Sequence, residues 1–283
     1  ALSEHPMIDY RIYNPLANRA GGAAMRELEN LADFSRINHR MHNKLLVVDG
    51  RVAIVGGRNQ ADEYYGYRAG HNFRDFEIIL QGPLASRLSG LFDLYWNDPW
   101  TIPIEHLVDR SEELSPTELQ DWLAGGSGIF EHPLPATDDQ WTALFQSGYT
   151  GSVDLIVDTP PERSPTVDFP VQLAEAFIQR IDATESDLLL ISAYFIPTQE
   201  LTDAISRAVS RGVKVRVLTN SLGSNNHVTA HAAYAEHRPS LLRAGAELYE
   251  LRADASATGL YVFEGLEENS ILGLHAKIAL FDA

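Results

Sequence analysis

The stretch His42–Asp49, with the sequence HNKLLVVD, decides how this chain of 283 residues is organised. It places a histidine, a lysine two residues later and an aspartate five residues after the lysine in an apolar, strand-like run. A second copy, His275–Asp282 with the sequence HAKIALFD, has the same spacing and the same apolar filling. One such octapeptide is compatible with chance. Two copies, each on a strand-like run, predict a duplicated half-domain and a site shared between the halves.

The composition is that of a soluble globular protein, but a strongly acidic one. The formal net charge is −17, from 22 Lys and Arg against 39 Asp and Glu. Because nonspecific nucleic-acid binding depends on Lys and Arg neutralising phosphates, this balance argues against a nucleic-acid partner. It also opposes adhesion to anionic lipid through charge alone. A phosphate-bearing substrate therefore needs a local cluster of donors. There is no cysteine, which excludes disulfides and thiolate metal sites.

Strand-like and helix-like segments alternate along the chain, which predicts α/β layers with mostly parallel sheets flanked by helices. The domain organisation expected from this pattern is a first half over residues 1–110, an irregular excursion over 111–148 and a second half over 149–283. Both halves are expected to be incomplete at the outer ends, so the chain reads as a fragment missing both ends. The segments with the clearest patterns are helices at 21–38, 83–96, 169–183 and 200–211 and strands at 152–158, 187–196 and 213–219.

The first motif is expected to form a β-hairpin. Residues 44–49 and 52–55 flank Asp49-Gly50, a strong signal for a two-strand turn. With a period of two along the strand, His42 and Lys44 project to one face, where the imidazole and the ammonium could hold one phosphate. Asp49 would face the opposite side and is expected to brace the turn.

Two histidines and two lysines facing one site suit covalent catalysis at phosphorus. One neutral imidazole attacks, and the other, protonated, gives its proton to the leaving alkoxide. The lysines stabilise charge on the non-bridging oxygens, and Asn59 adds a neutral donor, so the route needs no metal ion or other cofactor. An attacking histidine needs an acceptor on its far nitrogen, and Asp75 is our candidate for that role.

These motifs resemble the phospholipase D superfamily, and specifically bacterial cardiolipin synthases of the C type. The similarity runs along most of the chain except about 100–148. The segments that carry it are Asn38–Lys44, Val55–Asn59, Asp62–Tyr64, Ser192–Pro197, Leu218–Leu222 and Val228–Tyr249.

The resemblance implies two pseudo-symmetric phospholipase D-like half-domains and a phosphatidyltransferase that makes cardiolipin. The substrate would be phosphatidylglycerol, with phosphatidylethanolamine as a further candidate, and the intermediate a phosphohistidine. It also implies peripheral contact with the cytoplasmic face of the bacterial inner membrane, without a transmembrane segment in this chain. The resemblance also implies residue roles. His42 would be the nucleophile and His275 the acid/base, while Lys44, Lys277 and Asn59 would bind phosphate. Asp75 would be the partner of the first histidine, and the motif aspartates Asp49 and Asp282 complete the catalytic set.

Several readings stay open. Asn220 and Ser221 end a strand, where they either contact a headgroup or cap the following helix. Gly57 stands where much of the superfamily has serine, and the turn that should follow Asp282 is absent. The alternative functions are a phosphodiester hydrolase of the phospholipase D type, and a non-catalytic lipid-binding relative.

Overall fold

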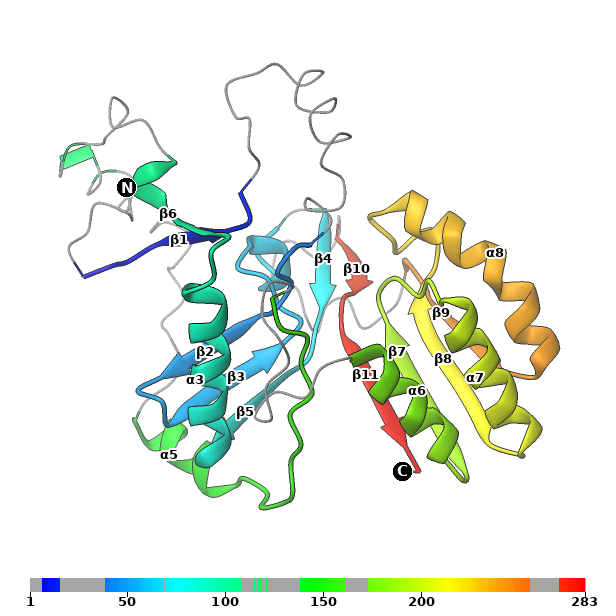
Figure 1. Ribbon diagram of the computed structural model, residues 1–283. Helices are drawn as coiled ribbons and strands as arrows, with labels where there is room; N and C mark the ends of the chain where they lie inside the picture. The colour runs from blue at the N-terminus through cyan, green and yellow to red at the C-terminus, as the bar shows by residue number, and fades with distance from the viewer. Residues whose placement is uncertain are drawn as a thin grey trace. The chain divides into compact units, whose positions relative to one another are not determined.

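The computed structural model describes residues 7–15, 39–68, 70–107, 115, 117–118, 121, 138–160, 173–254 and 270–282 (Figure 1). The helix expected at 21–38 lies outside these ranges. The chain forms two compact units, each of which is described here by itself. The first comprises Ala1–His42, Gly90–Leu155 and Thr159–Phe169, and the second comprises Asn43–Ser89, Ile156–Asp158 and Pro170–Ala283.

The first unit contains a two-stranded antiparallel sheet and the approach to the first motif. Strand β1 (Arg11–Tyr13) pairs with β6 (Thr101–Pro103). Asn14, which follows β1, is fully buried, and its side-chain amide donates a 2.7 Å hydrogen bond to the carbonyl of His39. This contact anchors the segment that leads to His42. The short helix η3 (Ile104–His106) and helix α5 (Asp138–Gln146) also belong to this unit.

A four-stranded sheet with the order β11-β7-β8-β9 forms the main core of the second unit. Two helical connections join its three parallel strands, and the sequence explains them: buried aliphatic runs make the strands, and the segments between them make helices that cover the sheet. Helix α7 contacts both α6 and α8, so the three helices lie in one layer (Figure 1). The elements are α6 (Leu173–Ala183), β7 (Asp187–Ser192), α7 (Gln199–Ser210), β8 (Lys214–Asn220), α8 (Val228–Ala244), β9 (Glu247–Leu251) and β11 (Lys277–Phe281).

The first motif forms the expected hairpin. Strands β2 (Leu45–Val48) and β3 (Val52–Gly56) pair antiparallel, and β5 (Glu77–Gln81) joins the other edge of β3. The turn needs left-handed backbone at two successive positions, and Asp49 and Gly50 supply it with φ of 53° and 63°. The short helix η2 (Asp62–Tyr64) follows β3, and helix α3 (Pro83–Trp96) follows β5 with the bounds expected from sequence.

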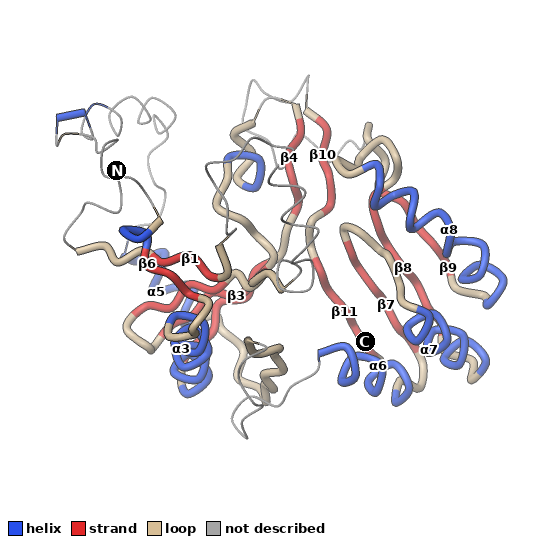
Figure 2. The backbone as a smooth tube through the Cα atoms, turned by 45° about the horizontal axis from the view of Figure 1, so that its top comes forward, coloured by secondary structure: helices blue, strands red, loops and turns tan. Residues whose placement is uncertain are grey.

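A two-stranded parallel ladder connects these parts of the second unit. Strand β4 (His71–Arg74) pairs with β10 (Ile271–Leu274), with Arg74 opposite Leu274 (Figure 2). Beyond Arg74 the chain continues through two residues into β5, which belongs to the hairpin sheet. Beyond Leu274 it continues through two residues into β11, which belongs to the four-stranded sheet. Both strands therefore change sheets at the same level of the ladder.

The α/β class is confirmed, but two details of the expectation are wrong. Among the described strands the sheets are mixed rather than mostly parallel: β7-β8-β9 and β4-β10 are parallel, whereas β1-β6, β2-β3-β5 and β7-β11 are antiparallel. For β2 and β3 the reason is local, since a short turn can join only antiparallel neighbours. Residues 152–158 do not form the expected strand, and no described strand pairs with them. The boundaries at 110 and 148 remain predictions.

Candidate active site

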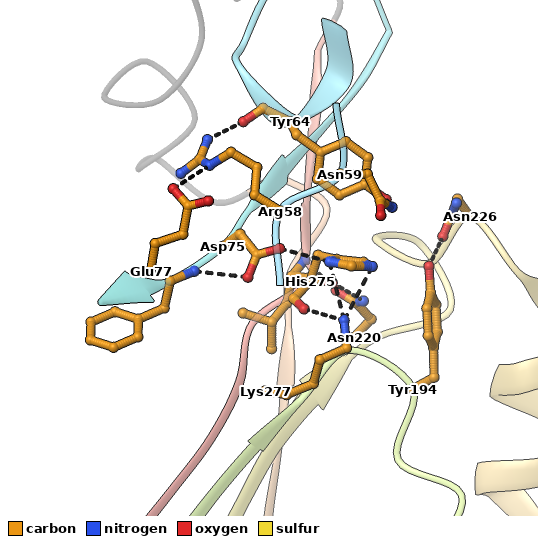
Figure 3. A network of polar contacts seen from close by, with 12 residues as sticks. Arg58, Asn59, Tyr64, Asp75, Glu77, Tyr194, Asn220, Asn226, His275 and Lys277 are labelled. Atoms are coloured by element: carbon orange, nitrogen blue, oxygen red, sulfur yellow. Dashed lines mark hydrogen bonds and ion pairs between the residues drawn. The ribbon is translucent and has the colours of Figure 1, made fainter. Parts of the chain in front are cut away.

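The candidate site lies where β4 and β10 leave their common ladder. Because Arg74 and Leu274 are opposite each other, the next residues, Asp75 and His275, emerge side by side. The backbone N–H of His275 donates a 2.8 Å hydrogen bond to the carbonyl of Arg74. Nδ1 of His275 then lies 2.7 Å from Oδ2 of Asp75 (Figure 3). Two residues 200 positions apart are thus paired by strand register.

Asp75 is a buried carboxylate held in one orientation. Its side chain has no exposed surface, and Oδ1 accepts a 2.8 Å hydrogen bond from the N–H of Phe76. Burial alone would raise the pKa of this carboxyl. The hydrogen bonds from His275 and Phe76 and the positive charge of Lys277 outweigh that effect, so the pKa lies below its ordinary value. Asp75 is therefore the anion that orients the neighbouring imidazole.

This pairing corrects one assignment from sequence. Asp75 was expected to hold His42, the nucleophile that the resemblance implies, whereas its partner in the structure is His275. The physical reason is the parallel register of β4 and β10, which spacing along the chain cannot reveal. His42 belongs to the first unit, where it is exposed and lies three residues before β2. Its role stays a prediction.

Gly57 explains how Asp75 fits so close to the first-motif turn. A Cβ atom at this position would lie 2.8 Å from Oδ2 of Asp75 and closer still to Oδ1. Any side chain larger than hydrogen would therefore push the carboxylate away from His275. This close approach accounts for glycine at a position where serine was the alternative.

Aromatic rings surround the His275 imidazole. The ring of Tyr64 meets it edge-on at 4.9 Å between centroids, and Phe73 lies at 5.6 Å. Tyr194 lies at 6.3 Å on a further side, and its hydroxyl donates a 2.6 Å hydrogen bond to Oδ1 of Asn226 (Figure 3). With Nδ1 bound by a carboxylate, the ring is fixed as the Nδ1–H tautomer when neutral, and Nε2 is left to exchange protons with a substrate.

The two motif lysines both act on this cluster. The ammonium of Lys277 folds back onto His275, 2.7 Å from its carbonyl oxygen and 3.1 Å from each ring nitrogen. Lys277 is exposed as a residue, but its ammonium is folded onto His275, and desolvation of the ammonium lowers the pKa of Lys277 to about 8. The charge of Lys44 adds to this effect and that of Asp75 opposes it. Desolvation likewise lowers the pKa of Lys44, again opposed by Asp75. The lysines of two motifs far apart in sequence thus share one electrostatic environment.

Asn59 and Tyr64 form a hydrogen-bonded pair beside the histidine. The Asn59 amide donates a 2.6 Å hydrogen bond to the Tyr64 hydroxyl, and its phosphate-binding role stays a prediction. Tyr64 is 8% exposed, and desolvation raises its pKa. Sequence reasoning did not single out Tyr64 for the site. The available signal was its position five residues after Asn59, in a short segment that must fold back over the turn.

Asn220 has a structural role, so the structure does not support the headgroup contact, which was one of its two open readings. It is 1% exposed, its amide donates to the carbonyls of Ala193 (3.0 Å) and Leu274 (2.8 Å), and its oxygen accepts from the N–H of Leu274 (2.7 Å). These bonds hold the residue just before His275. Ser221 closes a tight turn with Ser224 instead of capping a long helix, through its N–H and its hydroxyl.

The motif aspartates are also structural. Asp282 accepts hydrogen bonds from the backbone N–H groups of Glu185, Ser186 and Asp187, at the opposite end of β11 from Lys277. At roughly 3.3 Å per residue, five residues separate it from Lys277 by about 17 Å. Counting Asp282 with the catalytic set was therefore wrong. Asp49 sits in the hairpin turn, as expected, and both aspartates have a φ of 53°.

Two further observations concern the described part of the chain only. No group of three or more His, Cys, Asp or Glu side chains there is placed to hold a metal ion. In the same ranges, no helix is both long enough and apolar enough to cross a bilayer.

Comparison with known proteins shows which family the chain resembles. Residues 177–283 match the family model described as cardiolipin synthase, phospholipase D-like domain. The chain is thus similar to the cardiolipin synthase branch of the phospholipase D superfamily.

Among the relatives, cardiolipin synthase C of Escherichia coli (strain K12) is 32% identical over 99% of this chain and 60% of its own length. An uncharacterised protein of Helicobacter pylori (strain ATCC 700392 / 26695) is 30% identical over 89% of this chain and 51% of its own. The chain thus spans between half and two thirds of these relatives. A crystal structure of a phosphatidylserine synthase from Haemophilus influenzae Rd KW20 aligns with 86% of this chain and 52% of its own, at 13% identity and a TM-score of 0.46.

Proposed function

We propose that the whole protein transfers a phosphatidyl group to a hydroxyl of phosphatidylglycerol and so makes cardiolipin. The observation that carries the proposal is the cluster of Asp75, His275, Lys277 and Lys44, which joins residues of both motifs around one imidazole. A buried, oriented acid/base beside two ammonium groups suits a reaction in which negative charge develops at phosphorus. The similarity to cardiolipin synthases supports the choice of substrate.

The proposed reaction has two steps with opposite proton movements. In the first, a ring nitrogen of His42 attacks phosphorus, a P–N bond forms, and the P–O bond to the leaving alcohol breaks as His275 gives that oxygen a proton from Nε2. In the second, the acceptor hydroxyl attacks phosphorus, its proton passes to Nε2 of His275, and the P–N bond breaks with its electron pair returning to His42. Lys44 and Lys277 stabilise the non-bridging oxygens in both transition states, and Asn59 adds a donor.

Hydrolysis is the second candidate, because water and an alcohol differ only in which oxygen reaches the intermediate. The aromatic rings of Tyr64, Phe73 and Tyr194 around His275 favour transfer, since apolar walls limit the access of water. A non-catalytic lipid-binding role is disfavoured by the cost of the cluster. Burying the Asp75 carboxylate and lowering the pKa of the Lys277 ammonium to about 8 are both unfavourable for folding, and neither improves packing.

The remaining parts of the proposal concern the whole protein. Two phospholipase D-like halves, with boundaries near residues 110 and 148, would each supply one motif. The substrates would be phosphatidylglycerol and phosphatidylethanolamine, reached by peripheral contact with the cytoplasmic face of the bacterial inner membrane. The expectation that nucleic acid is no partner rests on the acidic balance of the chain.

The test uses the full-length protein with vesicles that contain labelled phosphatidylglycerol, with and without phosphatidylethanolamine. Formation of cardiolipin that is lost in His42→Ala and His275→Ala supports the proposal. Phosphatidic acid as the sole product assigns the protein to the hydrolases, and no turnover assigns it to the non-catalytic class. Acid quenching of a reaction with ³²P-labelled lipid, followed by peptide mapping, identifies the histidine that carries the label. Label on His275 in place of His42 would reverse the two proposed roles.

A further inference from the structure

A cavity lies near the histidine cluster and has no role in the two proposed reaction steps. It is a cavity of about 450 Å³ in the second unit, lined by side chains that include Glu63, Arg68, His71, Phe73 and Asn226. Ligand pockets typically measure about 300–1,000 Å³, so this cavity has room for a small headgroup and not for a pair of acyl chains.

Two aromatic side chains connect the cavity to His275. The ring of Phe73 contacts two imidazoles, with its centroid 4.8 Å from that of His71 and 5.6 Å from that of His275. On the other side, Tyr194 packs against His275 and binds Asn226 through its hydroxyl (Figure 3). A molecule in the cavity thus contacts residues that themselves pack on the acid/base or on its neighbour Tyr194.

The polar groups of the cavity select among ligands. The carboxylate of Glu63 lies 3.3 Å from the guanidinium of Arg68, which is largely exposed at the rim. The pKa of His71 is lowered, chiefly by burial, and its Nε2 lies 3.1 Å from the carbonyl of Ser224. A neutral imidazole that donates to this carbonyl is fixed in place and brings no charge.

The charge balance in the cavity favours hydroxyl groups over an ammonium group. Glu63 already has a cation as its partner, so a second cation would meet the repulsion of Arg68. A hydroxyl group, in contrast, can donate to the carboxylate without displacing Arg68. The guanidinium of Arg68 is largely exposed and has further N–H donors, to which a phosphate on the same small molecule would bind.

The geometry points to this cavity as the alcohol subsite: it binds a small polyol that carries a phosphate, with Glu63 as the residue that selects hydroxyl groups. The inference rests on the proposed function, in which the acceptor lies on the side of His275. In that step the acceptor oxygen bonds to phosphorus, its proton moves to Nε2 of His275, and the phosphorus–histidine bond breaks. Glu63 touches the neighbouring hydroxyl and holds the reacting one in position.

The experiment measures how the covalent intermediate divides between alcohol and water. The full-length protein receives phosphatidyl-p-nitrophenol in neutral vesicles, and p-nitrophenolate release reports formation of the intermediate. Glycerol, 1-propanol and 2-aminoethanol are supplied in turn at equal concentration, and the ratio of transfer product to phosphatidic acid is measured. We expect glycerol to give a ratio about tenfold above those of 1-propanol and 2-aminoethanol, as is typical for one hydrogen bond to a charged group.

Two variants test the cavity. Glu63→Gln should lower the glycerol preference about tenfold, because the carboxylate acceptor is lost. Ile271→Trp, which fills the cavity from its wall without removing a charge, should lower transfer to glycerol relative to hydrolysis. The matched control is Glu250→Gln, which removes an ion pair with Arg238 of the same unit, outside the cavity lining. It should keep the wild-type ratios.

The outcomes distinguish failure of the alcohol subsite from failure of the proposed function. If p-nitrophenolate is released but folded Glu63→Gln and Ile271→Trp both keep the wild-type ratios, the cavity is not the alcohol subsite, although the proposed function stands. A preference for 2-aminoethanol over glycerol would likewise overturn the inference. If the wild-type protein releases no p-nitrophenolate, the proposed function fails and the inference fails with it.

Discussion

The ammonium of Lys277 gives the proposed reaction a pH dependence that can be calculated. This ammonium has to be charged to stabilise the non-bridging phosphate oxygens, and its pKa in the folded protein is lowered to about 8. The cation is lost as pH rises through that value. With a single titration, the charged fraction is about 0.9 at pH 7 and about 0.1 at pH 9, so kcat/KM should fall about tenfold between them.

The assay is the rate of lipid transfer at low substrate concentration from pH 6 to pH 10, so that kcat/KM reports the free enzyme. Lys277→Arg keeps a permanent cation, and whatever activity it retains should lack the fall near pH 8. Lys277→Met should lose about 10²–10³-fold in kcat at pH 7, the typical effect of removing one donor from a developing oxyanion. An alkaline fall centred near pH 10, or one near pH 8 that persists in Lys277→Arg, would refute the reasoning.

Three further variants test the surroundings of the pair. Asp75→Asn keeps the shape but frees the His275 tautomer, so the rate should fall at least about 100-fold with little change in the circular dichroism spectrum; a rate within a few-fold of wild type would contradict the assigned partner. Gly57→Ala should give a similar loss by displacing that carboxylate, and the double variant with Asp75→Asn should be no worse than the single one. Asn220→Ala should cost about 2–4 kcal/mol in denaturant unfolding and also slow the reaction, because it releases the strand that carries His275; an unfolding free energy equal to wild type would exclude this bracing role.

Much of the site could be predicted because the motif is local. The repeat of His, Lys and Asp located His275, Lys277 and Lys44 from spacing alone, and the hairpin at Asp49-Gly50 followed from its turn residues. The helix at Pro83–Trp96 was predicted from its apolar face and its preceding Gly-Pro break. In each case the information lies within about fifteen consecutive residues.

The predictions that failed concern contacts between strands that are far apart in the sequence. The partner of Asp75 is set by the register of β4 against β10, and nothing near Asp75 in the sequence encodes that register. Asn220 was placed correctly at a strand end, but its bonds to Ala193 and Leu274, which use its whole amide, could not be read from the sequence. The expected strand at 152–158 has the right pattern and no described neighbour to pair with, since a pattern cannot supply a free sheet edge.

Strands β4 and β10 lead into different sheets at Asp75 and His275, and this affects the order in which the chain folds. The acid/base becomes oriented only when β10 has docked in register on β4, a closure that joins positions 200 residues apart. Such distant pairings form late, because the entropy of closing the intervening chain must be offset first. In a partly folded chain, no carboxylate would therefore orient the His275 imidazole, and the chain would not react with lipid. Under the proposed function, catalytic activity would therefore appear only once β10 has paired with β4.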